Sequence, residues 1–113
     1  MNLEEQEVKK GLLVNITYGV KKVGFNIVDP TKTIKQIIDG LIVAARNNPD
    51  TMWDLPEINN AGQRIIYYLG RMVDGKEEIF KNKDRRTGDQ EHLRDYKVKE
   101  GDNLVLLKRV YAG

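Results

Sequence analysis

Apolar and polar residues alternate near the start of the chain, in the segment Leu12–Tyr18 and again in Val23–Val28. A period of two is typical of β-strands that bury one face. A short GVKK turn separates the two segments, which are therefore predicted to form a β-hairpin. Asp29-Pro30 ends the second strand, because proline has no amide hydrogen to donate to a sheet.

The apolar period then changes to that of a helix. Thr33 and Gln36 have the spacing of a capping box, in which each side chain binds the other residue's backbone amide. The residues behind them form one apolar helix face: Ile34, Ile37, Ile38, Leu41, Ile42 and Ala45. Gly40 interrupts this helix and weakens it by roughly 1 kcal/mol relative to alanine. Asn47-Asn48-Pro49 is predicted to end it.

Three further apolar segments predict strands. RIIYYLG is one strand, and RMVDG predicts a short strand that closes on an Asp-Gly turn. After an LRDY turn, a terminal strand is predicted from Asn103 to about Arg109. Since a single helix cannot cover both faces of a sheet, the predicted fold class is α+β. We expect a roll in which one main helix crosses a mixed sheet of about four to five strands.

Two long loops interrupt this pattern, at about 47–63 and about 76–92. The first holds Trp53, and the second is charged and includes the KNKDRR cluster, which is typical of a solvated surface. No repeat or linker divides the chain. We therefore predict a single domain over 11–113, preceded by a flexible leader of mixed charge over 1–10.

Composition narrows the functional classes. The 19 basic and 17 acidic residues give a net charge of +2, without the clustering that nucleic-acid binding requires. The absence of cysteine excludes disulfides, thiolate metal sites and a cysteine nucleophile. No apolar run approaches the ~18 residues of a transmembrane segment, and the leader lacks the apolar region of a secretory signal. A cytoplasmic location is expected.

The sequence contains no recognisable catalytic arrangement. Its single histidine, His92, lies in a charged loop and is predicted to be an ordinary surface residue. No glycine-rich phosphate loop is present, and the acidic residues lack the spacing of metal ligands. We therefore expect no enzymatic activity, no cofactor and no metal site.

Three stretches of the chain resemble ubiquitin. Leu12–Leu41 follows ubiquitin's spacing without a gap, Gln63–Lys76 does so with one extra residue, and Leu93–Gly113 ends at the same point. The resemblance implies a ubiquitin-like β-grasp fold whose extra length lies in the leader and the two loops. Asp95–Leu104 also has the form D-Y-x-[VI]-x-x-G-D-x-L, and so resembles the small ubiquitin-like components of bacterial type VII secretion systems.

The second strand departs from ubiquitin's pattern. Its apolar residues are the odd-numbered ones of Val23–Val28, whereas gap-free spacing would turn the even-numbered ones inward. A slip of one residue reverses every side chain of a strand. We therefore expect an altered turn or a bulge near Val20–Lys22, with Val28 packed at the end of the strand.

The resemblance also implies a partner-binding surface on the open face of the sheet, opposite the helix. Ile66, Tyr68, Val105 and Leu107 are predicted to lie on this face, and the basic pair Lys108 and Arg109 that follows them is also predicted to bind partners. An exposed apolar cluster usually marks an interaction surface. The alternative is that a long loop covers this face, with Trp53 as the lid.

The C-terminus is a further candidate site, because ubiquitin-like modifiers and the related sulfur carriers act through a free C-terminal glycine. Gly113 would be the conjugated residue, preceded by Ala112, and glycine avoids crowding in the narrow channel of an activating enzyme. The chain departs from the family in ending Ala-Gly rather than Gly-Gly, with the bulky Tyr111 upstream.

Three functional hypotheses follow from the resemblance. The first is a protein modifier attached through Gly113, whose partners are activating or conjugating enzymes. The second is a non-conjugated adaptor that binds secretion machinery through the sheet face. The third is a sulfur carrier. In each case we expect protein partners and a monomeric chain.

Overall fold

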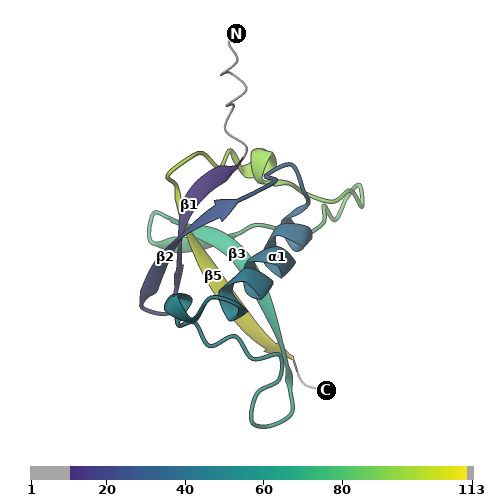
Figure 1. The fold of residues 1–113 in the computed structure, drawn as a ribbon. Coiled ribbons are helices and arrows are strands. Elements are labelled where there is room, and N and C mark those ends of the chain that lie inside the picture. Colours follow the sequence, from purple (N-terminus) through teal and green to yellow (C-terminus); the bar gives the residue numbers. More distant parts are fainter. Residues whose placement is uncertain (1–10, 112–113) are drawn as a thin grey trace.

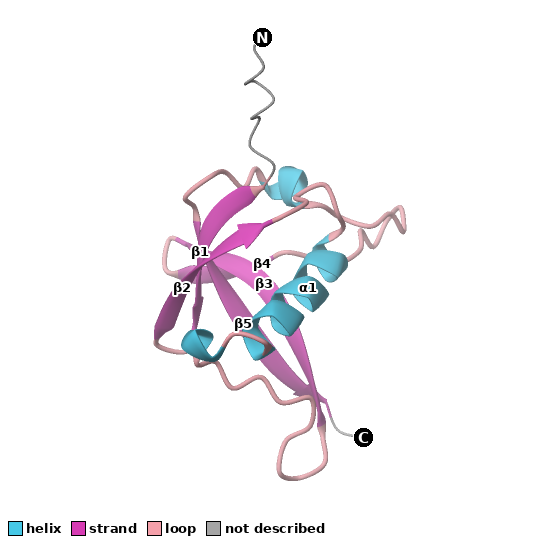
Figure 2. Cartoon of the chain, in the orientation of Figure 1, coloured by secondary structure: helices cyan, strands magenta, loops and turns pink. Residues whose placement is uncertain are grey.

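The computed structural model describes residues 11–111, and these form one sheet with one main helix (Figures 1 and 2). The strands are β1 (Leu12–Tyr18), β2 (Lys21–Ile27), β3 (Arg64–Val73), β4 (Lys76–Ile79) and β5 (Asn103–Tyr111). The helix α1 spans Ile34–Arg46, and the short 3-10 helices η2 and η3 span Pro49–Thr51 and Leu93–Tyr96.

The five strands lie in the order β2-β1-β5-β3-β4. β1 and β5 pair in parallel, and the other neighbouring pairs are antiparallel. α1 crosses one face of this mixed sheet (Figure 1). The α+β roll predicted from the alternating and helical periods is confirmed.

The capping box at the start of α1 is confirmed. The Gln36 amide donates to Thr33 Oγ1 over 3.2 Å, and the Thr33 amide donates to Gln36 Oε1 over 3.1 Å. The predicted apolar face of the helix supplies five buried residues to the core: Ile34, Ile37, Ile38, Leu41 and Ala45. The other side of this core comes from inward residues of the sheet, among them Val14, Ile16, Leu104 and Leu106.

The β1–β2 hairpin is regular, so of the two alternatives expected near Val20–Lys22, an altered turn or a bulge, the bulge is wrong. Tyr18 pairs with Lys21 across a two-residue turn, in which Gly19 adopts a φ of +65°. Glycine at the first turn position is what such tight hairpins need, and the turn leaves the alternation of β2 intact. The expected packing of Val28 is also wrong: its exposed fraction is 72%, because the strand ends at Ile27.

Trp53 lies on the side of the sheet that α1 covers, and it does not cover the open face. It is 8% exposed, and its Nε1–H donates to the Lys21 carbonyl over 3.2 Å. Its ring lies 5.9 Å from the Tyr18 ring and 5.3 Å from the Phe25 ring, centroid to centroid. The alternative in which Trp53 is a lid on the open face is therefore wrong.

The predicted loop at 76–92 is wrong at its beginning, where β4 and the fully buried Phe80 are found. The residues of RMVDG do not form a separate strand; they continue β3 to Val73. Asp74 and Gly75 then turn the chain with φ values of +52° and +80°. β4 contains only charged residues and one isoleucine, since it lies at the sheet edge.

Candidate partner-binding surface

Neighbouring residues of β3 and β5 point to opposite faces of the sheet. Tyr67 and Leu106 are buried beneath the helix, whereas Tyr68 and Leu107 are only half-buried. Because side chains alternate along a strand, each inward residue is followed by one on the open face. The register places Tyr68 beside Leu107, and Ile66 beside Arg109.

We define the open-face patch by the residues that β3 and β5 place together on this face: Ile66, Tyr68, Val105, Leu107, Arg109 and Tyr111. A hydrogen bond and a cation–π contact hold one end of the patch. The Tyr68 and Tyr111 hydroxyl oxygens lie 2.6 Å apart, and the Arg109 guanidinium lies 5.7 Å above the Tyr68 ring. The hydrogen bond to Tyr111, followed by partial burial, raises the pKa of the Tyr68 hydroxyl. The patch therefore combines apolar strand residues with one cation at its rim.

Five of the six residues predicted for partner binding lie in the open-face patch, and Lys108 does not. Lys108 lies two residues after Leu106, so its side chain projects from the face of the sheet that α1 crosses. This part of β5 is exposed. The conjugation residues Ala112 and Gly113 lie outside the described residues. Sequence reasoning left Tyr111 out of the patch, although its position two residues after Arg109 was the available signal.

The two long connections lie elsewhere in the molecule. Trp53 and Leu55 of the first, and Phe80 of the second, belong to the core on the helix side. The Arg46 guanidinium further ties the first connection to the end of α1, through hydrogen bonds to the Leu55 carbonyl. Four residues of the patch therefore stay only half-buried: Ile66, Tyr68, Val105 and Leu107.

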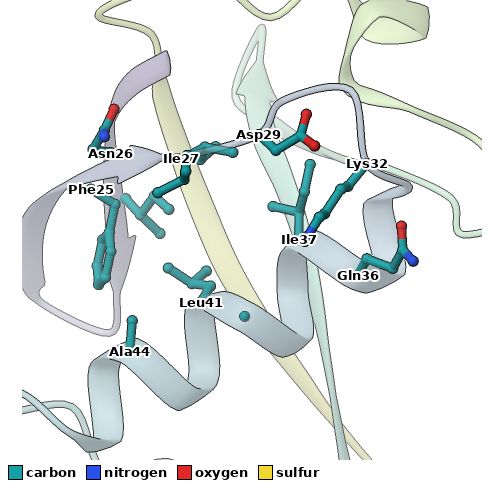
Figure 3. A pocket seen from close by; sticks show the side chains of 12 residues that line it. Phe25, Asn26, Ile27, Asp29, Lys32, Gln36, Ile37, Leu41 and Ala44 are labelled. Carbon is teal, nitrogen blue, oxygen red and sulfur yellow. The ribbon is translucent and has the colours of Figure 1, made fainter. Parts of the chain in front are cut away.

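A second surface feature is a groove between β2 and α1, with a volume of about 210 Å³. Figure 3 shows Phe25 and Ile27 of β2 on one wall, and Ile37, Leu41 and Ala44 of the helix on the other. Its lining is mainly apolar. Nothing in the sequence pattern alone distinguishes these residues from ordinary core positions.

Within residues 11–111, no group of three or more histidine, aspartate or glutamate residues is placed to hold a metal ion. In the same range, no helix has the length and apolar character needed to cross a membrane.

No family model matches the chain, and none of the curated proteins matches its sequence. Solved structures do match. The EccD5 ubiquitin-like domain from Mycobacterium xenopi is 20% identical with a TM-score of 0.56, over 93% of this chain and 99% of that domain. A chain of the MycP5-free ESX-5 inner membrane complex is 20% identical with a TM-score of 0.55, over 93% of this chain but only 22% of that one.

A ubiquitin-like domain of the Arabidopsis thaliana protein At2g32350 is also similar, at 13% identity and a TM-score of 0.49, over 95% of this chain and 86% of that one. At these identities the likeness concerns the fold. The mixed five-stranded sheet crossed by one helix, and the match over nearly all of the EccD5 domain, point to the same fold. The chain therefore has the ubiquitin-like β-grasp fold that its sequence predicts.

Proposed function

We propose that the chain is a non-enzymatic adaptor module that binds a protein partner through the open-face patch. The observation that carries this proposal is the row of half-buried apolar side chains on the open face of β3 and β5, next to Arg109. Such a cluster, held on paired strands, offers an apolar contact area that needs no rearrangement before it binds.

The likeness to the EccD5 domain supports a secretion complex as the class of partner. One part of a chain of the ESX-5 inner membrane complex, 22% of its length, has a similar fold over 93% of this chain. We propose that this module docks, in the cytoplasm, onto machinery of the type VII secretion kind. Covalent attachment is not needed for that role.

The modifier hypothesis makes a different demand, since it needs Gly113 to be activated and joined to a target. It stays a prediction, because Ala112 and Gly113 lie outside the described residues. Deletion of Ala112 and Gly113 distinguishes the adaptor hypothesis from the modifier hypothesis. An adaptor retains its binding and cellular role, whereas a modifier or sulfur carrier loses both its adducts and its role.

The patch is tested with the double substitution Ile66→Asp and Leu107→Asp. A photo-crosslinking residue at Tyr111 should give a defined adduct with a secretion component in the native cell, and the double variant should lose that adduct. Val43→Asp is the matched control, because Val43 is 57% exposed on α1, outside the patch. Circular dichroism checks that all three proteins fold. An adduct that survives the double substitution contradicts the proposal.

A further inference from the structure

The segment between β4 and η3 is a closed loop whose two ends are fastened to the body of the domain. The Phe80 and Tyr96 rings stack with their centroids 4.5 Å apart. The Tyr96 hydroxyl accepts a hydrogen bond from the Lys81 amide over 2.9 Å, and it donates one to the Glu91 carboxylate. We call residues 81–91 the basic loop. Because Lys81 begins this loop and Glu91 ends it, Tyr96 holds both of its ends.

The two legs of the basic loop pair with each other. Lys83 and Gln90 form an isolated β-bridge. The Asp84 amide donates to the Asp89 carbonyl over 2.9 Å. The loop projects from the body of the domain beside the first turn of α1 (Figures 1 and 2). This segment is therefore an ordered hairpin, although its composition alone is typical of a solvated surface.

Asp84 shapes the tip of the basic loop. Its Oδ1 accepts hydrogen bonds from the Arg86 amide over 2.7 Å and from the Thr87 amide over 3.2 Å. The Gly88 amide donates to the Asp84 carbonyl over 2.8 Å, and Gly88 has a φ of +77°, which favours glycine. These bonds hold Arg85 and Arg86 in one turn, so a partner does not have to order them when it binds.

Acidic and basic side chains of the basic loop have different surroundings. Its four basic side chains are exposed: Lys81, Lys83, Arg85 and Arg86. Two of its three acidic side chains, Asp84 and Glu91, already accept the hydrogen bonds given above. The Arg86 side chain is 85% exposed, whereas that of Asp84 is 33% exposed. Of the four cations, only Arg86 has an acidic partner within 4.0 Å among residues 11–111, and that partner is Asp84.

Charge and composition identify the kind of partner. Four basic residues against three acidic ones leave the basic loop with a net charge of +1. Attraction to an anionic membrane is therefore weak, since each charge near such a surface contributes about 1 kcal/mol, and the loop has no apolar side chain to insert. Arginine acts at short range instead, because its guanidinium binds a carboxylate through two parallel hydrogen bonds. Two neighbouring arginines on a fixed turn favour the carboxylates of an acidic peptide.

We propose that the basic loop is a second docking site, which binds an acidic segment of a partner protein. Arg85 and Arg86 bind carboxylates of this segment at the tip, and Lys81 and Lys83 meet further acidic residues along one leg. The loop leaves the sheet after β4, whereas the open-face patch lies on β3 and β5. The module can therefore hold an apolar surface and an acidic segment at once.

The probe is a capped peptide, Glu-Glu-Asp-Glu-Glu-Asp-Glu-Glu, titrated into the full chain and followed by amide NMR and fluorescence anisotropy. The double substitution Arg85→Gln and Arg86→Gln should weaken binding about tenfold or more, because it removes the charge-assisted hydrogen bonds. Lys21→Gln with Lys22→Gln is the matched control. It removes the same charge from exposed positions of β2, at the other edge of the sheet, and should bind within about twofold of the original chain.

Two substitutions at Asp84 distinguish a shaped site from a positively charged one. Asp84→Asn removes the negative charge but keeps an oxygen that can accept the Arg86 and Thr87 amides, so binding should be equal or tighter. Asp84→Ala removes the same charge together with the acceptor. It should weaken binding about threefold, because the turn loses its hydrogen bonds. Circular dichroism checks that every variant folds.

Four outcomes overturn the proposal. One is equal affinity of the probe for the original chain and for the arginine double variant. Another is equal affinity for Asp84→Ala and Asp84→Asn, because charge alone would then act. A third is amide shifts confined to the neighbourhood of Arg109, which would place the acidic segment on the open-face patch. The fourth is binding to phosphatidylglycerol vesicles that the arginine double variant loses, without binding of the probe, because the loop would then serve a membrane.

Discussion

The two faces of β3 and β5 carry similar side chains but have different surroundings. Ile65, Tyr67 and Leu106 lie under α1, while Ile66, Tyr68 and Leu107 lie on the side that the helix leaves open. Composition does not distinguish the two sets, since each contains isoleucine, tyrosine and leucine. Coverage by α1 and by the connection around Trp53 makes one face a core, and its absence makes the other a candidate surface.

Among the variants that compare the two faces, removal of Trp53 is expected to lower the free energy of unfolding most. Trp53→Ala deletes a buried ring that packs on Tyr18 and Phe25, and should lower the free energy of unfolding by about 3–5 kcal/mol. Urea unfolding measures it, with Met52→Ala as control, because Met52 is the preceding residue and is 75% exposed. A Trp53→Ala protein of unchanged stability that loses partner binding would place Trp53 on the binding surface instead.

A pair of leucines makes the comparison sharper. Leu106→Ala should cost about 2–5 kcal/mol, because it leaves a cavity beneath the helix. Leu107→Ala, one residue further on the open face, should cost about 1 kcal/mol or less. The two variants remove the same atoms from the same strand, so the difference in urea midpoint reports coverage alone. Equal losses would mean that the open face is packed after all.

Much of this fold follows from local patterns in the sequence. The alternation of Leu12–Tyr18, the capping box at Thr33 and the apolar face of α1 each have a physical signature that survives in the structure. β4 has none, because an edge strand of lysine and glutamate buries too little to alternate. It forms because Asp74-Gly75 turns the chain back and Phe80 enters the core.

The candidate sites were predictable to different degrees. Strand alternation and the resemblance to ubiquitin place Ile66 and Leu107 on the open face, since only the register of two strands is needed. The same alternation turns Lys108 to the other face, so of the predicted basic pair only Arg109 joins the patch. The groove between β2 and α1 could not be predicted, because it depends on the distance between the helix and the strand.

High pH should weaken the helix side of the molecule. Burial, followed by the neighbouring Tyr18, raises the pKa of Tyr67 to about 12, and burial with the bond to Glu91 raises the pKa of Tyr96 to about 12. In the unfolded chain both hydroxyls ionise near pH 10. Their contribution to stability is therefore complete below about pH 10 and is lost as the pH rises toward about 12.

Urea unfolding at a series of pH values measures this loss. Tyr67→Phe cannot ionise, so its stability should fall less steeply over that range, although it also loses the 2.7 Å bond to the Pro56 carbonyl and starts lower. A variant whose decline parallels that of the original chain would show that Tyr67 is accessible to solvent, contrary to its place in the core.

The smallest expected effect concerns the open face, where Tyr68 owes its raised pKa to a different cause. The hydrogen bond with Tyr111 comes first and burial second, so Tyr111→Phe should bring the pKa of Tyr68 back toward its ordinary value. Ultraviolet titration of the phenolates would show this, with Tyr68→Phe to assign the signal. Tyr67 should titrate as before, because burial on the other face sets its pKa. A shift in both tyrosines would mean that the two faces are not independent.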